Sequence, residues 1–190
     1  MRHRLQDQKA FTLLEVIISV GIFVLLSISM VDLIIGTDNL LRSQQVTIDV
    51  IGSASEAMSD IQTMATQATQ VAASHSFSGT TYTTSTSTLV LQLPSITSTG
   101  SIVSGQYDYV TYYATGTSAY RIIDPGTGSV RPSGTKRLSD TVTAFTFTYG
   151  SSDPTLSTST MIDIQTQGTF KKVNAATHLH EQVYLRNSSY

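Results

Sequence analysis

The chain opens on an abrupt change from polar to apolar positions. Residues 1–10, MRHRLQDQKA, are polar and contain more Arg and Lys than acid. Residues 11–35 are almost continuously apolar. As an α-helix this run would be about 38 Å long, enough to cross a hydrocarbon core of about 30 Å. The pattern therefore predicts a basic leader followed by a membrane-spanning helix.

Three kinds of segment begin with a basic head and an apolar run. They are a cleaved secretory signal, a retained signal anchor and a pilin-type leader that is cut on the cytoplasmic side. The run is longer than the roughly 7 to 15 apolar residues of a secretory signal, although Ser27-Ile28-Ser29 offers a small-x-small site for signal peptidase. Basic residues ahead of the span predict a single-pass topology in the cytoplasmic membrane, with the N-terminus inside and the C-terminal domain outside.

Glu15 is an acid inside the apolar run. A carboxylate in a membrane costs about 2.5 to 3.5 kcal/mol on insertion scales unless it is paired. One interpretation is that Glu15 reaches the lipid headgroups. The other is that cleavage before Phe11 creates an α-amino group one helical turn away, which neutralises the carboxylate within the chain or between neighbouring chains.

The string KAFTLLEVIISVGIF resembles the class III signal of type IV prepilins and type II secretion pseudopilins. The resemblance implies cleavage by prepilin peptidase between Ala10 and Phe11, and N-methylation of Phe11. It also implies that Glu15 pairs with the N-terminal amine of an adjacent subunit during assembly. The family usually has Gly before the cut, where this chain has Ala10.

Helical spacing of apolar residues continues beyond the apolar run with lower hydrophobicity. Apolar positions recur every three or four residues from Val50 to Val71, and acidic and amide side chains fall on the other faces. One continuous helix from about Thr12 to Val71 is the simplest interpretation. Gly36 and Gly52 weaken this helix and mark positions where it can bend.

The period of the pattern changes after the helix. Residues 73–88 are nearly all Ser, Thr and small residues, which favours a linker of loop or edge structure because hydroxyl groups compete for backbone hydrogen bonds. From residue 89 a period of two predicts short strands with one apolar face. The predicted apolar faces are Leu89, Leu91 and Leu93; Tyr107, Tyr109, Thr111 and Tyr113; Phe145, Phe147 and Tyr149; Ile162 and Ile164; and Leu179, Val183 and Leu185.

The connections between these strands are short, which predicts an antiparallel meander. Residues 107–114 and 119–124 flank the sequence TGTS and predict a hairpin. A long helix that covers one face of a small antiparallel sheet is an α+β fold. The expected organisation is a leader (1–10), a transmembrane helix (11–35), an amphipathic continuation of the helix (36–72), a linker (73–88) and an extracytoplasmic antiparallel β domain (89–190).

The strand region is also similar to J-type minor pseudopilins and W-type minor pilins. The segments YVTYYATGTSAYRIID, KRLSDTVTAFTFTYG and HEQVYLRN carry this similarity. The matching residues are Tyr112, Tyr120, Arg121, Leu138, Asp140, Val142, Phe147, Tyr149, Leu185, Arg186 and Asn187.

Composition and motifs indicate no catalytic chemistry. Charged residues make up 13% of the chain, the net charge is −2 and there is no cysteine, so neither nucleic-acid binding by bulk electrostatics nor a thiolate metal site is expected. His178, His180 and Glu181 come nearest to a metal cluster, but an exposed polar strand face is the favoured interpretation and no metal or cofactor is predicted. Asp124 and Asp153 are interpreted as turn residues that cap their own backbone.

These observations favour a structural role over an enzymatic one. The expected protein is a subunit, minor or initiating, of a type IV pilus or a type II secretion pseudopilus. Its expected partners are prepilin peptidase, other pilin or pseudopilin subunits, an assembly platform protein, and membrane lipid before assembly. Its expected final location is the filament or the cell surface. The alternative is a secreted or signal-anchored surface binding domain that does not assemble into a filament.

Overall fold

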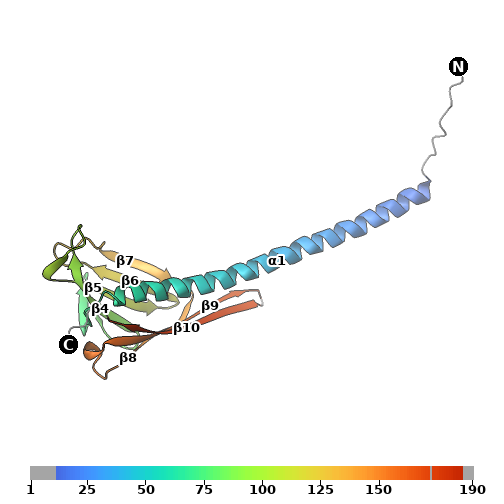
Figure 1. Cartoon of the computed structure of the whole chain (residues 1–190). Helices are drawn as coiled ribbons and strands as arrows, with labels where there is room; N and C mark the ends of the chain where they lie inside the picture. Colours follow the sequence, from blue (N-terminus) through green and yellow to red (C-terminus); the bar gives the residue numbers. More distant parts are fainter. Residues whose placement is uncertain (1–11, 172, 186–190) are drawn as a thin grey trace, which may run out of the picture. The chain divides into compact units, whose positions relative to one another are not determined.

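The computed structural model describes residues 12–171 and 173–185 (Figure 1). Helix α1 (Leu13–Ala65) is 53 residues long and runs through both Gly36 and Gly52. The chain divides into two units, Met1–Gln44 and Gln45–Tyr190, and each is described by itself. After α1 come strands β1 (Gln70–Val71), β2 (Ser74–Phe77), β3 (Thr80–Thr83), β4 (Thr88–Ile96), β5 (Ile102–Thr115), β6 (Ser118–Asp124), β7 (Gly134–Ser139), β8 (Val142–Tyr149), a 3₁₀ turn η1 (Pro154–Leu156), β9 (Ser159–Phe170) and β10 (Val173–Tyr184).

The strands of the second unit form three antiparallel sheets. The largest has the order β1-β4-β5-β6-β7, the second has the order β10-β9-β8, and β2 pairs with β3. Strands β4 to β7 and strands β8 to β10 each follow one another as neighbours, so the predicted meander topology is confirmed. The predicted α+β class, a long helix packed on antiparallel sheet, is also confirmed.

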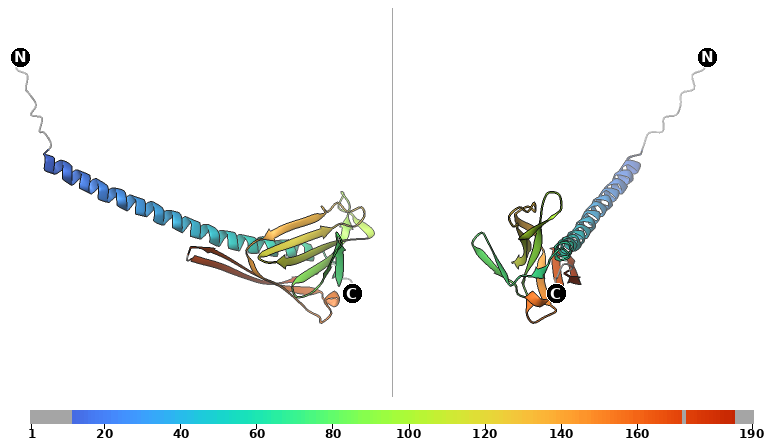
Figure 2. Two further views of the ribbon diagram at one scale, coloured as in Figure 1. Left: turned by 180° about the vertical axis from the view of Figure 1, so that it is seen from behind. Right: turned by 60° about the vertical axis from the view of Figure 1, so that its left-hand side comes forward.

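The C-terminal part of α1 lies between the two larger sheets of its unit (Figures 1 and 2). On one side the Tyr112 hydroxyl of β5 donates a hydrogen bond to the Asp60 carboxylate at 2.7 Å. On the other side Thr166 of β9 donates from its hydroxyl to the backbone carbonyl of Val50 at 3.0 Å. The buried helix residues are Val50, Ala54, Ala57, Met58, Ile61 and Ala65. Their spacing of three and four confirms the predicted apolar stripe.

Most of the predicted apolar strand faces are confirmed as core. Leu89, Leu91 and Leu93 have no exposed surface, and the same is true of Ile162 and Ile164. Phe145, Phe147, Val183 and Leu185 are also buried. One core therefore joins the two sheets and the helix segment, because these residues and the helix stripe from Ala54 to Ala65 form a single buried cluster.

The predicted face of β5 was wrong. The structure buries Asp108, Val110 and Tyr112, whereas the tyrosines of the predicted face are exposed (Tyr107) or half-buried (Tyr109 and Tyr113). Thr111 is the one residue of the predicted face that is buried. Aromatic packing explains this reversal. The Tyr109 ring stacks on His75 of β2 with centroids 3.9 Å apart, and Tyr113 lies 5.1 Å from Tyr82 of β3. The tyrosines thus contact a second layer instead of the main core.

Two boundaries also differ from the prediction. The helix ends at Ala65 rather than near Val71, because its last turn tightens through the Ala68 N–H to the Ala65 carbonyl and the chain then pairs with β4 as β1. Residues 73–88 are not a plain linker, since β2 and β3 form a hairpin there. This hairpin supplies the His75 and Tyr82 rings that cover the tyrosine face of β5.

The hairpin between β5 and β6 is confirmed with a tighter turn than predicted. Thr115 pairs with Ser118, which leaves Gly116 and Thr117 as a two-residue loop. Gly116 has a φ of 59°. A positive φ at the first loop position is what a type II′ turn needs, and glycine adopts it without strain.

Gly168 of β9 marks the closest approach of the sheet to the helix. A Cβ atom at this position would lie 2.8 Å from side-chain methyl carbons of both Val46 and Val50. We expect Gly168→Ala to lower the free energy of unfolding by about 1–3 kcal/mol, because the added methyl group overpacks this contact. Chemical denaturation followed by tyrosine fluorescence measures the change.

Gly52→Ala is the matched control for this substitution. Gly52 lies in α1, the helix that Gly168 approaches. A Cβ atom added at Gly52 would have no atom within 4 Å. Alanine is favoured over glycine in a helix by up to about 1 kcal/mol, so this variant should be as stable as the original chain or more stable. Equal destabilisation by both substitutions would contradict the close packing at Gly168.

Candidate functional site

The first turn of α1 is fixed by Thr12 and Glu15. The Thr12 hydroxyl accepts a hydrogen bond from the Glu15 backbone N–H at 3.3 Å, and the Thr12 carbonyl accepts from the N–H of Val16, also at 3.3 Å. Threonine followed three residues later by glutamate is the capping-box sequence. Glu15 therefore lies at the third helical position, where a negative charge is also favoured by the helix dipole.

Glu15 has no cationic partner among residues 12–44. Arg42 is the basic residue of this stretch, and its Nε lies 2.9 Å from the Asp38 carboxylate. That pair is separated from Glu15 by about 35 Å of helix. A positive charge for Glu15 must therefore come from outside the described part of this unit.

The apolar side chains of the first unit are exposed around the whole helix. Leu13 and Phe23 have exposed fractions of 79% and 70%, and Leu33 on a later turn has 69%. Length and composition make α1 able to cross a membrane. A helix that is hydrophobic on all sides is stable when lipid or other apolar helices surround it. This helix therefore fits a membrane-anchored protein.

Hydroxyl groups within this apolar segment are satisfied by the helix itself. Ser19 donates to the Glu15 carbonyl at 2.8 Å, and Ser27 donates to the Phe23 carbonyl at 2.8 Å. Ser29 and Thr37 make the same bond to the carbonyl four residues earlier. Such bonds remove the need for water, so these residues are compatible with a hydrocarbon environment.

Asp32 is a second carboxylate in this segment and was not among the predicted site residues. It follows Glu15 by about 26 Å along the helix axis. Since a hydrocarbon core is about 30 Å thick, a helix that holds Glu15 near one interface places Asp32 near the other. The signal that could have found it is simply a charge within residues 11–35.

The predicted cleavage and methylation sites, Ala10 and Phe11, lie outside the described residues. Arg186 and Asn187 of the similarity to minor pilins do so as well. The remaining residues of that similarity belong to the second unit, and several are core residues: Tyr112, Leu138, Val142, Phe147 and Leu185.

An ion-paired cluster joins α1 to the five-stranded sheet. Arg121 of β6 donates to the Asp60 carboxylate at 2.6 Å, and the Tyr112 hydroxyl donates to the same carboxylate. Burial raises the pKa of the Tyr112 hydroxyl well above its usual value, and the charge of Asp60 raises it further. Tyr112 therefore stays protonated and acts as a hydrogen-bond donor. Both residues carry the similarity to minor pilins, but their partner Asp60 was not predicted.

A second buried carboxylate, Asp108, holds the loop between β6 and β7. It is fully buried and accepts hydrogen bonds from the Ser95 hydroxyl at 2.7 Å and the Gly126 N–H at 2.8 Å. Ser129 donates at 2.8 Å, and Arg131 forms a close ion pair with the same carboxylate. Burial raises the pKa of Asp108, but these four donors outweigh it and hold the pKa below its usual value. This cluster was not predicted, because an apolar face made of Tyr107 and Tyr109 leaves Asp108 on the opposite, outer face of β5.

The two turn aspartates have different roles. Asp153 begins the 3₁₀ turn and accepts from the Thr155 backbone N–H at 2.9 Å, so its predicted capping role is confirmed. The prediction for Asp124 was wrong. Asp124 is the last residue of β6, and its carboxylate lies 2.7 Å from Nε2 of His75 on β2.

Comparison with known proteins identifies the N-terminal segment. Residues 5–31 match the family model of the prokaryotic N-terminal methylation motif. Searches among curated proteins and among solved structures found no match. The matched range contains Ala10, Phe11 and Glu15 and ends within the exposed apolar part of α1. The chain therefore combines a prepilin-type N-terminal methylation motif with a pilin-like α+β fold, and these are the features of a type IV pilin-like or pseudopilin-like precursor.

Proposed function

We propose that this protein is a structural subunit, minor or initiating, of a type IV pilus or a type II secretion pseudopilus. Prepilin peptidase cuts it between Ala10 and Phe11, and the new N-terminus is methylated. The mature chain then leaves the membrane by packing α1 against the helices of other subunits. The observation that carries the proposal is the methylation motif at residues 5–31 on a helix whose apolar side chains are exposed on all sides.

Charge at the helix start supports assembly through Glu15. Glu15 has no cation within residues 12–44, and processing before Phe11 would create an α-amino group about one turn away. In an apolar environment an unpaired carboxylate is costly, so a neighbouring subunit that supplies an amine favours docking. This pairing gives the acid a role in assembly, whereas the contact with Thr12 is made by the backbone N–H of Glu15 and does not require an acid.

The second unit provides the outward-facing part of the subunit. With the basic leader in the cytoplasm, residues 45–190 lie outside the cytoplasmic membrane. The preference for a minor, initiating subunit rests on the J-type and W-type similarity of the strand segments. Tyr112 and Arg121 of that similarity meet at Asp60 and join α1 to the sheet. The protein works by assembly and not by catalysis, together with other subunits and an assembly platform protein.

Recovery of the chain from isolated filaments tests this proposal. In cells with a functional assembly machine, sheared filaments should contain the chain at a low ratio to the major subunit. In cells without prepilin peptidase, the chain should remain in the membrane fraction. Release of a soluble domain into the medium, independent of the peptidase, would instead support a secreted binding domain. Retention in the membrane with the peptidase present and filaments assembled would support a simple surface anchor.

A further inference from the structure

Three metal-ligating side chains meet on the outer face of the β8–β10 sheet. Asp163 of β9 places its Oδ2 atom 2.6 Å from Nε2 of His178 and 3.3 Å from Nδ1 of His180, both on β10. One ligand atom from each of these residues lies within 4.8 Å of the others. This cluster is far along the chain from the N-terminal segment, and the assembly mechanism does not use it.

The backbone of two paired strands fixes the positions of the three residues. β9 and β10 pair without a register shift from Ser159↔Tyr184 to Phe170↔Val173. His180 is directly opposite Asp163 in this ladder, and His178 lies two residues earlier on the same face. Preorganisation on strands reduces the ordering needed to form a site.

Glu181, which the sequence analysis grouped with the histidines, is not part of the cluster. It pairs with Ile162, whose side chain is fully buried in the core. Because side chains alternate between faces, Glu181 points away from the face that carries His180. The third residue of the cluster is Asp163 instead of Glu181. The pairing register of β9 with β10 is needed to identify it.

The donor set suits a divalent transition metal. Two imidazoles and one carboxylate are typical ligands of zinc, with metal–ligand distances of about 2.0–2.2 Å. Ligand atoms around a tetrahedral ion at these distances are about 3.3 Å apart. The contact of Asp163 with His180 has this separation and that with His178 is shorter, so small side-chain rotations bring the three atoms to coordinating distance.

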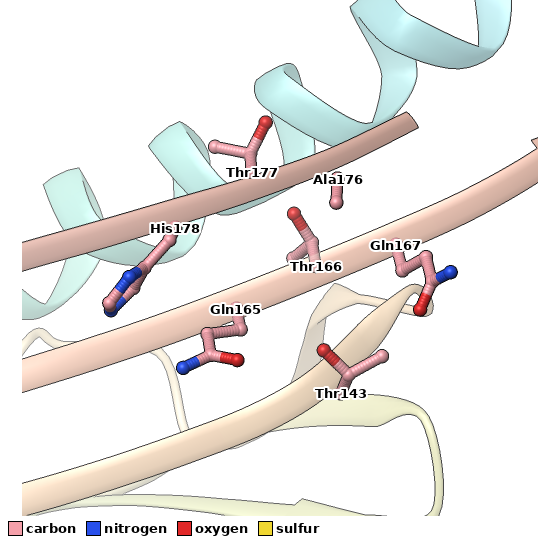
Figure 3. A pocket seen from close by; sticks show the side chains of 7 residues that line it. All are labelled: Thr143, Gln165, Thr166, Gln167, Ala176, Thr177 and His178. Atoms are coloured by element: carbon pink, nitrogen blue, oxygen red, sulfur yellow. The ribbon is translucent and has the colours of Figure 1, made fainter. Parts of the chain in front are cut away.

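The cluster is accessible to solvent, and a neighbouring side chain helps to orient its carboxylate. The side chains of His178 and His180 are 55% and 54% exposed, and that of Asp163 is 24% exposed. The Gln165 amide donates to the other oxygen of Asp163 at 3.4 Å, which helps to orient the carboxylate. A shallow pocket of about 260 Å³ adjoins the cluster, with His178 and Gln165 in its lining (Figure 3). A metal held by three protein ligands therefore has space for a water molecule or another donor.

We propose that Asp163, His178 and His180 bind one divalent transition-metal ion of the zinc type. The ion links β9 to β10, which pairs with β9 alone in its sheet, and keeps at least one coordination position open to solvent. This inference does not depend on assembly into a filament.

Zinc binding to the full-length chain tests the proposal. The purified protein, in detergent micelles and without an affinity tag, is stripped of metal and titrated with ZnCl₂ in competition with a chromogenic zinc indicator. We expect one Zn²⁺ per chain. Asp163→Asn, His178→Ala and His180→Ala should each weaken binding at least about tenfold, because each removes a direct ligand. Circular dichroism without zinc should be the same for all variants.

Two control variants separate this site from adventitious binding. Glu181→Gln removes a neighbouring acid on the same strand, and His75→Gln removes a histidine that contacts Asp124 on another sheet. Both should bind zinc as the original chain does. Absence of stoichiometric binding, equal binding by the three ligand variants, or loss of binding in His75→Gln would each overturn the proposal.

Discussion

Glu15→Gln should reduce incorporation of the chain into filaments at least about tenfold while leaving its insertion into the membrane unchanged. The substitution removes the negative charge that pairs with a neighbouring N-terminal amine. It keeps the backbone N–H that donates to the Thr12 hydroxyl, and glutamine suits this position of the capping-box sequence as well as glutamate does. A loss of about 1.4 kcal/mol in subunit docking already corresponds to a tenfold effect. The measurement is the ratio of this chain to the major subunit in sheared filaments, compared with its amount in membranes.

Three further variants define what the charge contributes. Glu15→Ala removes the charge and the side-chain oxygens but keeps the backbone N–H that donates to Thr12, so it should reduce incorporation at least as much as Glu15→Gln. Glu15→Asp retains the charge and should restore part of the incorporation. Asp32→Asn removes the other carboxylate of the apolar segment, far from the N-terminus, and should leave incorporation near that of the original chain. Normal incorporation of Glu15→Gln would contradict the pairing of the Glu15 carboxylate with a neighbouring N-terminal amine.

Arg131→Ala should lower the free energy of unfolding of the second unit by about 3–5 kcal/mol. The substitution leaves Asp108 fully buried without its cation. Removing one partner of a buried pair costs this much because the remaining charge stays desolvated and unpaired. Arg131 also donates to the Pro94 carbonyl at 2.6 Å and the Gln67 amide oxygen at 2.9 Å, so two more acceptors lose a donor. Chemical denaturation of the full chain in micelles, followed by tyrosine fluorescence, measures the effect.

Lys136→Ala is the matched control for Arg131→Ala. Lys136 lies on β7 and its amine is 2.8 Å from the Glu56 carboxylate of α1, but both side chains are about half exposed. Exposed pairs contribute about 0–1 kcal/mol, so this variant should be nearly as stable as the original chain. Similar losses for the two variants would contradict the account of Asp108 as a buried charge that depends on Arg131.

The same cluster predicts how stability depends on pH. The folded-state pKa of Asp108 is below its usual value of about 3.9, because its four hydrogen-bond donors outweigh the effect of burial. The unfolded chain therefore binds this proton more readily than the folded chain does. The contribution of Asp108 is present above the unfolded pKa and is lost as the pH falls through the lower folded value.

Local patterns in the sequence predicted much of the fold. The period-2 residues of β4, β8 and β9 predicted core faces that the structure confirms, because alternation alone decides the face of a half-buried strand. The spacing of three and four residues from Val50 onward predicted the buried stripe of α1, because this spacing places side chains on one face of a helix.

The errors arose where contacts distant in sequence decide the structure. The tyrosines of β5 looked like a core face, yet they pack on the β2–β3 hairpin, which composition alone had suggested to be a linker. Val71 continued the helical spacing but belongs to β1, because its backbone pairs with β4. Propensity and periodicity could not anticipate either pairing.

The candidate sites likewise differ in whether a local sequence pattern or a contact distant in sequence defines them. Ala10, Phe11 and Glu15 follow one another closely in sequence, so a contiguous motif was enough to find them. Asp60 with Arg121, Asp108 with Arg131, and Asp163 with His178 are each brought together by strand pairing or helix packing. No spacing within a single segment marks such pairs, and the register of the sheets had to be known first.

A prepilin-type precursor of this kind is processed before Phe11. The most direct test is the intact mass and N-terminal sequence of the protein recovered from the membranes of its own cells. We expect a chain that begins at N-methylated Phe11. A chain that begins after Ser29, or one that still begins at Met1 in cells with an active prepilin peptidase, would contradict it.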